Sequence, residues 1–180
     1  MKLPQKNQIS YLIIAFIFLA LGLYFADRKF SVKAAKDTVV QQLFSSQLKD
    51  VDGNPQKISQ WQGQFLLVNF WATWCKPCVQ EMPELQALSL AFKSKQLQVV
   101  GMGIDSPAQI RAFRDQHHIT YPLLVAGLEG TDLGTALGNQ VGGLPFTVLI
   151  SPDGRILKHY VGRLKMDELR RDIAQLNLGT

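Results

Sequence analysis

The sequence predicts an α/β domain, a central mixed β-sheet flanked by helices, that follows an apolar N-terminal segment. Residues 9–26 contain no charged side chain. After residue 64, short apolar runs alternate with segments that carry apolar residues at spacings of three and four, the pattern of strands alternating with helices. The length of 180 residues allows one domain with its own core in addition to the apolar segment.

The apolar segment has the length of a membrane span. As a helix that rises ~1.5 Å per residue, residues 9–26 would reach roughly 27 Å, close to the hydrocarbon thickness of a bilayer. A cleaved signal peptide is the alternative, but Tyr24 and Ala26 do not give the small-x-small pattern of a cleavage site. We therefore predict an N-terminal cytoplasmic segment (1–8), an uncleaved transmembrane anchor (9–26), a polar tether (27–37) and a folded domain (38–180).

The net charge of +5 belongs to the residues that flank the apolar segment. Residues 1–36 hold six of the 19 Lys and Arg and one of the 14 Asp and Glu, which leaves 13 of each sign from Asp37 onward. A neutral domain argues against binding to nucleic acid. Charge counting alone would place the domain in the cytoplasm, because more positive residues follow the span than precede it. A short positive segment before an apolar core is, in contrast, how export signals begin.

Each predicted element of the domain is based on a local pattern. Strands at 43–48 and 56–58 flank the turn-rich residues 52–55 and predict a β-hairpin, and a helical turn follows at 59–63. The continuous apolar run 65–71 predicts a central strand buried on both faces. The later elements are a helix over 75–95 kinked at Pro83, a strand over 97–105, a helix from Pro107, a strand at 121–124, a short helix at 131–137, a strand ending at Ile150, an antiparallel strand over 155–161 and an amphipathic helix over 166–178.

The two cysteines of the chain, Cys75 and Cys78, lie where the central strand meets the next helix. With no other cysteine, a disulfide framework or a four-thiolate zinc site is excluded, and C-x-x-C after a strand favours a redox dithiol. N–H groups at a helix N-terminus stabilise a thiolate, so we predict that Cys75 is the exposed nucleophile and that Cys78 resolves the mixed disulfide. Lys76 adds positive charge, and Pro77 suits the first helical turn. The alternatives are an inert buried pair and half of a metal site completed by a distant histidine.

The segment 69–78, together with the Glu-Met-Pro at 81–83, resembles the active-site segment of thioredoxin-fold proteins. More narrowly, it resembles the TlpA/ResA/CcmG group of membrane-tethered thiol–disulfide oxidoreductases, over roughly residues 38–180. The resemblance implies a thioredoxin fold with an N-terminal β-hairpin and a central βα insertion, preceded by one transmembrane helix. It also implies attachment to the inner (cytoplasmic) membrane, with the domain in the periplasm or another extracytoplasmic space.

Two further site residues follow from the resemblance. Pro145 matches the proline that is cis in thioredoxin-fold proteins, where it would expose the Leu144 backbone to an extended substrate; an ordinary strand-entry proline is the alternative. Glu81 matches an active-site glutamate of ResA-like proteins and shares a helix face with Cys78. It is either a proton donor and acceptor for the dithiol or an acid favoured by the helix dipole. Asn69 stands where thioredoxin has a buried acid, so a buried proton acceptor must come from elsewhere.

These observations predict a protein thiol–disulfide oxidoreductase. Its catalytic residues are expected to be Cys75, Cys78, Glu81 and Pro145, and its substrate-binding residues Trp74, Lys76, Pro77 and Leu144. The resemblance implies a periplasmic reductase of specific protein disulfides, such as those of apocytochromes c or copper-site proteins, recharged by a membrane thiol reductant of the DsbD/CcdA type.

We expect no cofactor and no metal, because the chain has no nucleotide or flavin motif and electrons can pass by exchange between proteins. Two alternatives use the same cysteines. One is an oxidant that donates its disulfide to other proteins. The other is a copper-binding metallochaperone, which would add His159 or His117 to the two sulfurs as soft ligands for Cu(I).

Overall fold

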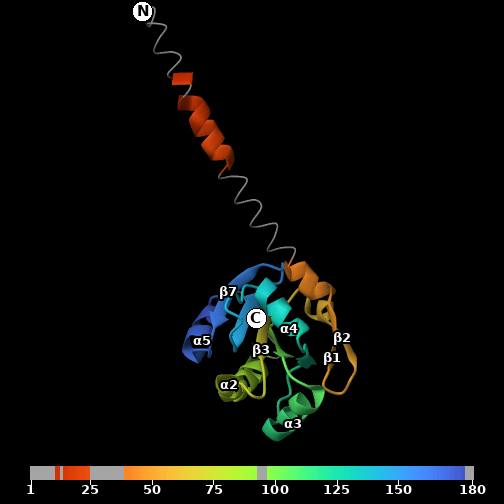
Figure 1. Cartoon of the computed structure of the whole chain (residues 1–180). Coiled ribbons are helices and arrows are strands. Elements are labelled where there is room, and N and C mark those ends of the chain that lie inside the picture. The colour runs from red at the N-terminus through yellow and green to blue at the C-terminus, as the bar shows by residue number, and fades with distance from the viewer. Residues whose placement is uncertain (1–10, 13, 25–38, 93–96, 177–180) are drawn as a thin grey trace, which may run out of the picture. The chain divides into compact units, whose positions relative to one another are not determined.

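The computed structural model describes residues 11–12, 14–24, 39–92 and 97–176. The chain divides into two units, Met1–Asp37 and Thr38–Thr180. In the first unit, residues 14–24 are helical (Figure 1). Their large apolar side chains are exposed. No helix among the described residues is both long and apolar enough to cross a membrane. The predicted span over 9–26 extends outside these residues, so it stays a prediction.

The described part of the second unit contains one mixed sheet of seven strands (Figure 1). The strands are β1 (Gln47–Asp50), β2 (Pro55–Lys57), β3 (Phe65–Trp71), β4 (Leu97–Gly103), β5 (Leu123–Val125), β6 (Phe146–Ile150) and β7 (Ile156–Val161). They lie in the order β2-β1-β5-β4-β3-β6-β7. The central β3 pairs in parallel with β4, which confirms the predicted β-α-β unit, and antiparallel with β6. Its continuous apolar sequence is explained by burial on both faces.

Helices cover both faces of this sheet. On one face, side chains of α2 (Lys76–Phe92), α3 (Pro107–His117) and α5 (Met166–Ala174) form one hydrophobic cluster with the sheet. On the other face, a second cluster contains side chains of the helix at 39–45, the 3-10 helix η1 (Ile58–Trp61) and α4 (Glu129–Ala136). The βα insertion predicted from the resemblance is β5 followed by α4, which adds one strand to the sheet and one helix to its second face.

One strand prediction was wrong. Residues 39–45 form a helix, whereas the turn pattern predicts a strand over 43–48. Val40, Leu43 and Phe44 are buried, and their spacing of three and four residues is the apolar face of a helix that covers the sheet. The hairpin itself is confirmed, because β1 pairs antiparallel with β2.

The other elements follow in the predicted order with shifted ends. Pro83 lies inside α2, and the helix begins at Lys76, one residue after the first cysteine. β4 ends at Gly103 instead of reaching 105, and α4 begins at Glu129 instead of 131. These shifts are of one or two residues, within the range by which helix and strand ends ordinarily vary. The last helix, α5, ends at Ala174, four residues before its predicted end at 178.

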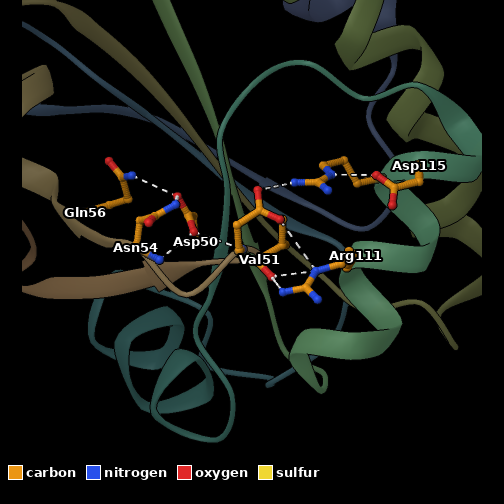
Figure 2. A network of polar contacts seen from close by, with 8 residues as sticks. Asp50, Val51, Asn54, Gln56, Arg111 and Asp115 are labelled. Atoms are coloured by element: carbon orange, nitrogen blue, oxygen red, sulfur yellow. Dashed lines mark hydrogen bonds and ion pairs between the residues drawn. The ribbon is translucent and has the colours of Figure 1, made fainter.

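The hairpin turn is held by the carboxylate of Asp50 (Figure 2). One oxygen accepts hydrogen bonds from the backbone N–H groups of Asp52 and Asn54, each at 2.9 Å. The other accepts from the side-chain amides of Asn54 at 3.2 Å and Gln56 at 3.0 Å. Burial acts to raise the pKa of Asp50, and the four hydrogen bonds together outweigh it and lower the pKa. The turn is therefore built around an ionised carboxylate.

Two arginines connect this turn to α3 (Figure 2). Arg111 donates from Nε to the carbonyl oxygen of Val51 at 2.9 Å. Arg114 pairs with Asp52 at 2.6 Å and with Asp115 at 2.8 Å. Because α3 leads directly from β4, these contacts fix the edge of the sheet relative to the central strands.

Candidate active site

Cys75 and Cys78 form a disulfide at the start of α2. Cys75 immediately precedes the helix, and its Sγ accepts a hydrogen bond from the backbone N–H of Cys78 at 3.3 Å. The sulfur thus lies where an N-cap acceptor would lie, a position that stabilises a thiolate. Cys75 is 6% exposed and Cys78 is fully buried. Cys75 is the more accessible sulfur, but the prediction of an exposed thiol was wrong, because the surrounding residues cover most of its side chain.

The turn that leads into Cys75 is held by residues after β4. The backbone N–H of Ile104 donates to the carbonyl oxygen of Trp71 at 2.8 Å. The carboxylate of Asp105 accepts hydrogen bonds from the hydroxyl group of Thr73 and, at 3.3 Å, from its backbone N–H. Sequence reasoning did not single out Asp105; its position directly after a strand parallel to the cysteine-bearing strand was the available signal.

Glu81 is fully buried one turn beyond Cys78. Its Oε1 accepts a hydrogen bond from Nδ2 of Asn69, and its Oε2 accepts one from the backbone N–H of Leu164, both at 2.8 Å. Burial raises the pKa of Glu81 to about 7, although both hydrogen bonds act to lower it. A carboxyl group of this pKa can gain and lose a proton near neutral pH, which suits proton exchange with a thiol. A helix-dipole role does not by itself require this burial.

Pro145 lies at the start of β6, and its peptide bond with Leu144 is cis, as the resemblance implies. Its carbonyl oxygen accepts a hydrogen bond from the backbone N–H of Gly162 at 2.9 Å. Two residues further along β6, the hydroxyl oxygen of Thr147 accepts a hydrogen bond from Nδ2 of Asn69 at 3.0 Å. The strand β6, which begins directly after the proline, therefore also reaches the polar group around Glu81.

A groove of about 600 Å³ opens beside Cys75. Of the predicted substrate-binding residues, Trp74, Pro77 and Leu144 line it, and Trp74 is 70% exposed. Lys76 is exposed but is not part of the lining. The lining residues, all of which the structure describes, include no charged side chain. The groove therefore suits an apolar or uncharged segment of a partner that reacts at Cys75.

The central insertion supplies another part of the lining of the groove. Leu128, which is 87% exposed, lies there with Gly130, Thr131 and Gly134 of α4, and Asn139 follows the helix. Sequence reasoning predicted this short helix but missed its place in the site. The helix has little local pattern that points toward Cys75, since its position depends on where β5 joins the sheet.

The two histidines considered as metal ligands lie against aromatic rings. The ring of His159 stacks on Phe146 with centroids 6.0 Å apart, and the ring of His117 stacks on Phe113 at 4.2 Å. Within residues 39–92 and 97–176 and the described part of the N-terminal unit, no group of three or more His, Cys, Asp or Glu side chains is arranged to hold a metal ion.

The Redoxin family model matches residues 31–175. The chain belongs to the Redoxin family. This Redoxin protein is similar to the thiol-disulfide oxidoreductase ResA of Geobacillus thermodenitrificans (strain NG80-2), with 25% identity over 177 residues that cover 98% of this chain and 99% of that protein. It is also similar to the thioredoxin-like protein YneN of Bacillus subtilis (strain 168), with 32% identity over 137 residues, 74% of this chain and 77% of that protein.

Solved structures agree with the fold. A thiol:disulfide interchange protein of the thioredoxin family from Chlorobium tepidum TLS matches with a TM-score of 0.67 and 26% identity, over 75% of this chain and 94% of that chain. These findings confirm the thioredoxin fold and the similarity to ResA-like and CcmG-like proteins. The Redoxin protein is a thiol–disulfide oxidoreductase, and the Cys75–Cys78 disulfide is the group in its structure that can perform this chemistry.

Proposed function

We propose that this Redoxin protein is an extracytoplasmic reductase that passes two electrons from its Cys75–Cys78 dithiol to disulfides of particular proteins. The observation that carries the proposal is the position of the pair. Cys75 lies on the wall of an uncharged groove at the start of α2, and Cys78 lies one turn before the buried Glu81. This arrangement separates the more accessible sulfur, that of Cys75, from a fully buried resolving thiol with a proton acceptor on its helix face.

The reaction proceeds in two exchange steps. The Cys75 thiolate attacks one sulfur of the substrate disulfide, forms a mixed disulfide and releases the first substrate sulfur, which takes up a proton from solvent. The Glu81 carboxylate then takes the proton of the Cys78 thiol, and the Cys78 thiolate attacks the sulfur of Cys75. The second substrate sulfur leaves and is protonated, and Glu81 later returns its proton to solvent. The substrate has gained two electrons and two protons, and the enzyme holds its disulfide.

The substrates that we propose are disulfides of apocytochromes c or copper-site proteins, and the proposed electron source is a membrane thiol reductant of the DsbD/CcdA type. Both follow from the resemblance to the TlpA/ResA/CcmG group. The uncharged groove supports a substrate segment that is extended and apolar. Trp74, Pro77 and Leu144 would contact that segment, with Pro145 at the edge of the site and Lys76 near it.

We place the domain in the periplasm, or the equivalent extracytoplasmic space, on the inner membrane. Residues 9–26 would act as a single uncleaved N-terminal span, since they carry no charge and the large apolar side chains of residues 14–24 are exposed.

The test of the exchange mechanism is covalent trapping in cells. Cys78→Ser keeps the nucleophile and removes the thiol that resolves the mixed disulfide, so adducts through Cys75 should accumulate and run at higher mass on non-reducing gels. Cys75→Ser is the matched control and should give none. Absence of any adduct from Cys78→Ser would overturn the proposal.

The direction of electron flow is tested by the reduction potential of the pair, equilibrated against dithiothreitol or glutathione buffers. A value near that of thioredoxin, ~−270 mV, would support a reductase. A value near that of strong disulfide donors, about −120 mV, would instead assign the oxidant function to the same residues.

A further inference from the structure

A buried polar cluster joins three elements on the α2 side of the sheet. Nδ2 of Asn69, on β3, donates to Oε1 of Glu81 at 2.8 Å and to the hydroxyl oxygen of Thr147, on β6, at 3.0 Å. All three residues are fully buried. Oδ1 of Asn69 is also buried, and it has no hydrogen-bond partner among the residues that the structure describes. Buried polar atoms are nearly always paired, so this acceptor calls for an explanation.

The orientation of the Asn69 amide follows from the chemistry of its neighbours. An ionised carboxylate can only accept hydrogen bonds, so the NH₂ group must point toward Glu81. The reversed amide would place two acceptor oxygens against each other. The hydroxyl group of Thr147 accepts or donates, so it can pair with either end of the amide. When the NH₂ group of Asn69 donates to ionised Glu81, Oδ1 points away from Glu81 and is left without a partner among the described residues.

The same arrangement does not suit protonated Glu81. Oε1 faces the NH₂ group of Asn69 and Oε2 faces the backbone N–H of Leu164, so both oxygens are opposite donors. A carboxylic acid also needs an acceptor for its O–H. Rotation of the amide about its Cβ–Cγ bond supplies one, because Oδ1 then lies toward Glu81 and Thr147 and can accept a hydrogen bond from each.

We propose that Asn69 is a positioning residue for the dithiol chemistry, whose amide takes two orientations. The NH₂ group points toward ionised Glu81, and the carbonyl oxygen points toward protonated Glu81. The inference deepens the proposed function, in which Glu81 takes a proton from Cys78. With either orientation available, the carboxyl group gains and loses this proton while its hydrogen bond to Asn69 is kept.

Other titratable groups near Glu81 affect its pKa, but none of them can take over the hydrogen-bonding role of Asn69. Arg163, in the loop between β7 and α5, acts to lower the pKa of Glu81, and Glu84, on α2, acts to raise it. These two residues form an ion pair at 3.0 Å. Because their charges are opposite, their effects on the pKa of Glu81 oppose one another. Tyr121, before β5, is buried, and burial together with the charge of Glu81 raises its pKa far out of the neutral range. Asn69 is uncharged and acts by hydrogen bonding alone.

The first experiment follows both side chains during a pH titration. The full oxidised chain, in detergent micelles and labelled with ¹³C and ¹⁵N at Asn and Glu, is measured by NMR from pH 5 to pH 9. We expect the side-chain amide resonances of Asn69 to shift with the same midpoint as the carboxyl carbon of Glu81. Amide resonances that stay constant while Glu81 titrates would show a fixed amide and overturn the proposal. This measurement needs no variant and no substrate, so its failure is separate from a failure of the trapping experiment.

The second experiment removes the amide. Asn69→Leu keeps a side chain of similar size without a donor or acceptor, so it removes a hydrogen bond from both forms of Glu81. Because the charge-assisted bond to the ionised form is the stronger one, the Glu81 midpoint should rise by roughly half a unit to one unit, about three- to tenfold in the acid constant. Thr147→Val, which keeps the contact between Asn69 and Glu81, should give a smaller shift. The pH optimum of disulfide exchange should move upward with the midpoint in Asn69→Leu. An unchanged Glu81 midpoint in this variant would contradict the proposal.

Discussion

Glu81 makes the stability of the oxidised domain depend on pH. Burial raises its pKa from 4.5 to about 7, so the folded state binds a proton more tightly than the unfolded state does. The resulting stabilisation is fully present below about pH 4.5 and is lost as the pH rises through 7. A difference of this size corresponds to about 3 kcal/mol in the free energy of unfolding.

Glu81→Gln should remove this dependence, because the amide does not titrate and resembles the protonated acid. We expect denaturant unfolding of the oxidised wild type to lose about 3 kcal/mol more than the variant between pH 4 and pH 8. Glu129→Gln, at an exposed position on α4, should keep the wild-type dependence. If wild type and Glu81→Gln gave parallel curves, the carboxyl group would not titrate in this range.

The sequence predicted those residues of the site that lie close to one another in the chain. Cys75 lies directly before α2, and Cys78 and Glu81 lie three residues apart on it, so the sequence spacing was enough to predict that they lie near one another. The long-range contacts of the cluster around Glu81 were not predictable. Thr147 accepts a hydrogen bond from Asn69 only because of the register of β3 with β6, and these two residues are 78 positions apart. The Leu164 N–H comes from a loop whose path depends on the packing of α5.

Among the elements, β4 and α3 approach each other closely at Gly103. A Cβ atom at this position would lie 2.4 Å from Cδ1 of Ile110 and 3.0 Å from its Cγ1. Gly103→Ala should therefore destabilise the domain by about 1–3 kcal/mol, because the core must move to admit the methyl group. Asp105 lies in the turn after β4 and accepts a hydrogen bond from the backbone N–H of Thr73. A shift of β4 would therefore also disturb the turn that leads into Cys75.

A double-mutant cycle tests the origin of this effect. Ile110→Val removes the atom that the new methyl group would meet, so the double variant should be more stable than the sum of the two single changes predicts, by 0.5 kcal/mol or more. Gly143→Ala is the control, since no atom lies within 4 Å of its Cβ position, and it should unfold like the wild type. Additive effects of the two substitutions would show that the loss comes from elsewhere.

Helices and strands with a clear periodicity of apolar residues were predicted well. The positions of elements that depend on packing against other elements were not. The buried strand β3 and the cysteine helix α2 have clear apolar patterns. The helix at 39–45 was missed because three apolar residues in a short segment beside a turn fit a strand as well as a helix. The place of α4 on the groove depends on β5, which joins the sheet between β1 and β4. No local pattern predicts that position.

The main feature of the whole molecule is the division of the chain into an N-terminal unit and a folded domain. The internal contacts separate Met1–Asp37 from Thr38–Thr180, and every residue of the candidate site lies in the second unit. The redox chemistry should therefore depend only on the domain, whereas location should depend on the first 37 residues. The sequence supplies the reason for this separation, since residues 1–37 contain the uncharged stretch 9–26 and hold six Lys and Arg against two acidic residues, a net +4 of the total of +5.

Deletion of residues 1–37 should release the protein from membranes without changing its reduction potential. The full chain is expected to stay in the membrane fraction after washes with high salt and alkaline carbonate, because burial of residues 9–26 in lipid does not depend on charge. The shortened chain should be soluble, with the same potential for the Cys75–Cys78 pair. Protease added to spheroplasts, whose inner membrane is exposed to the medium, should digest the domain of the full chain. Release of the full chain by carbonate would contradict the anchor, and protection of the domain from protease would reverse its proposed orientation.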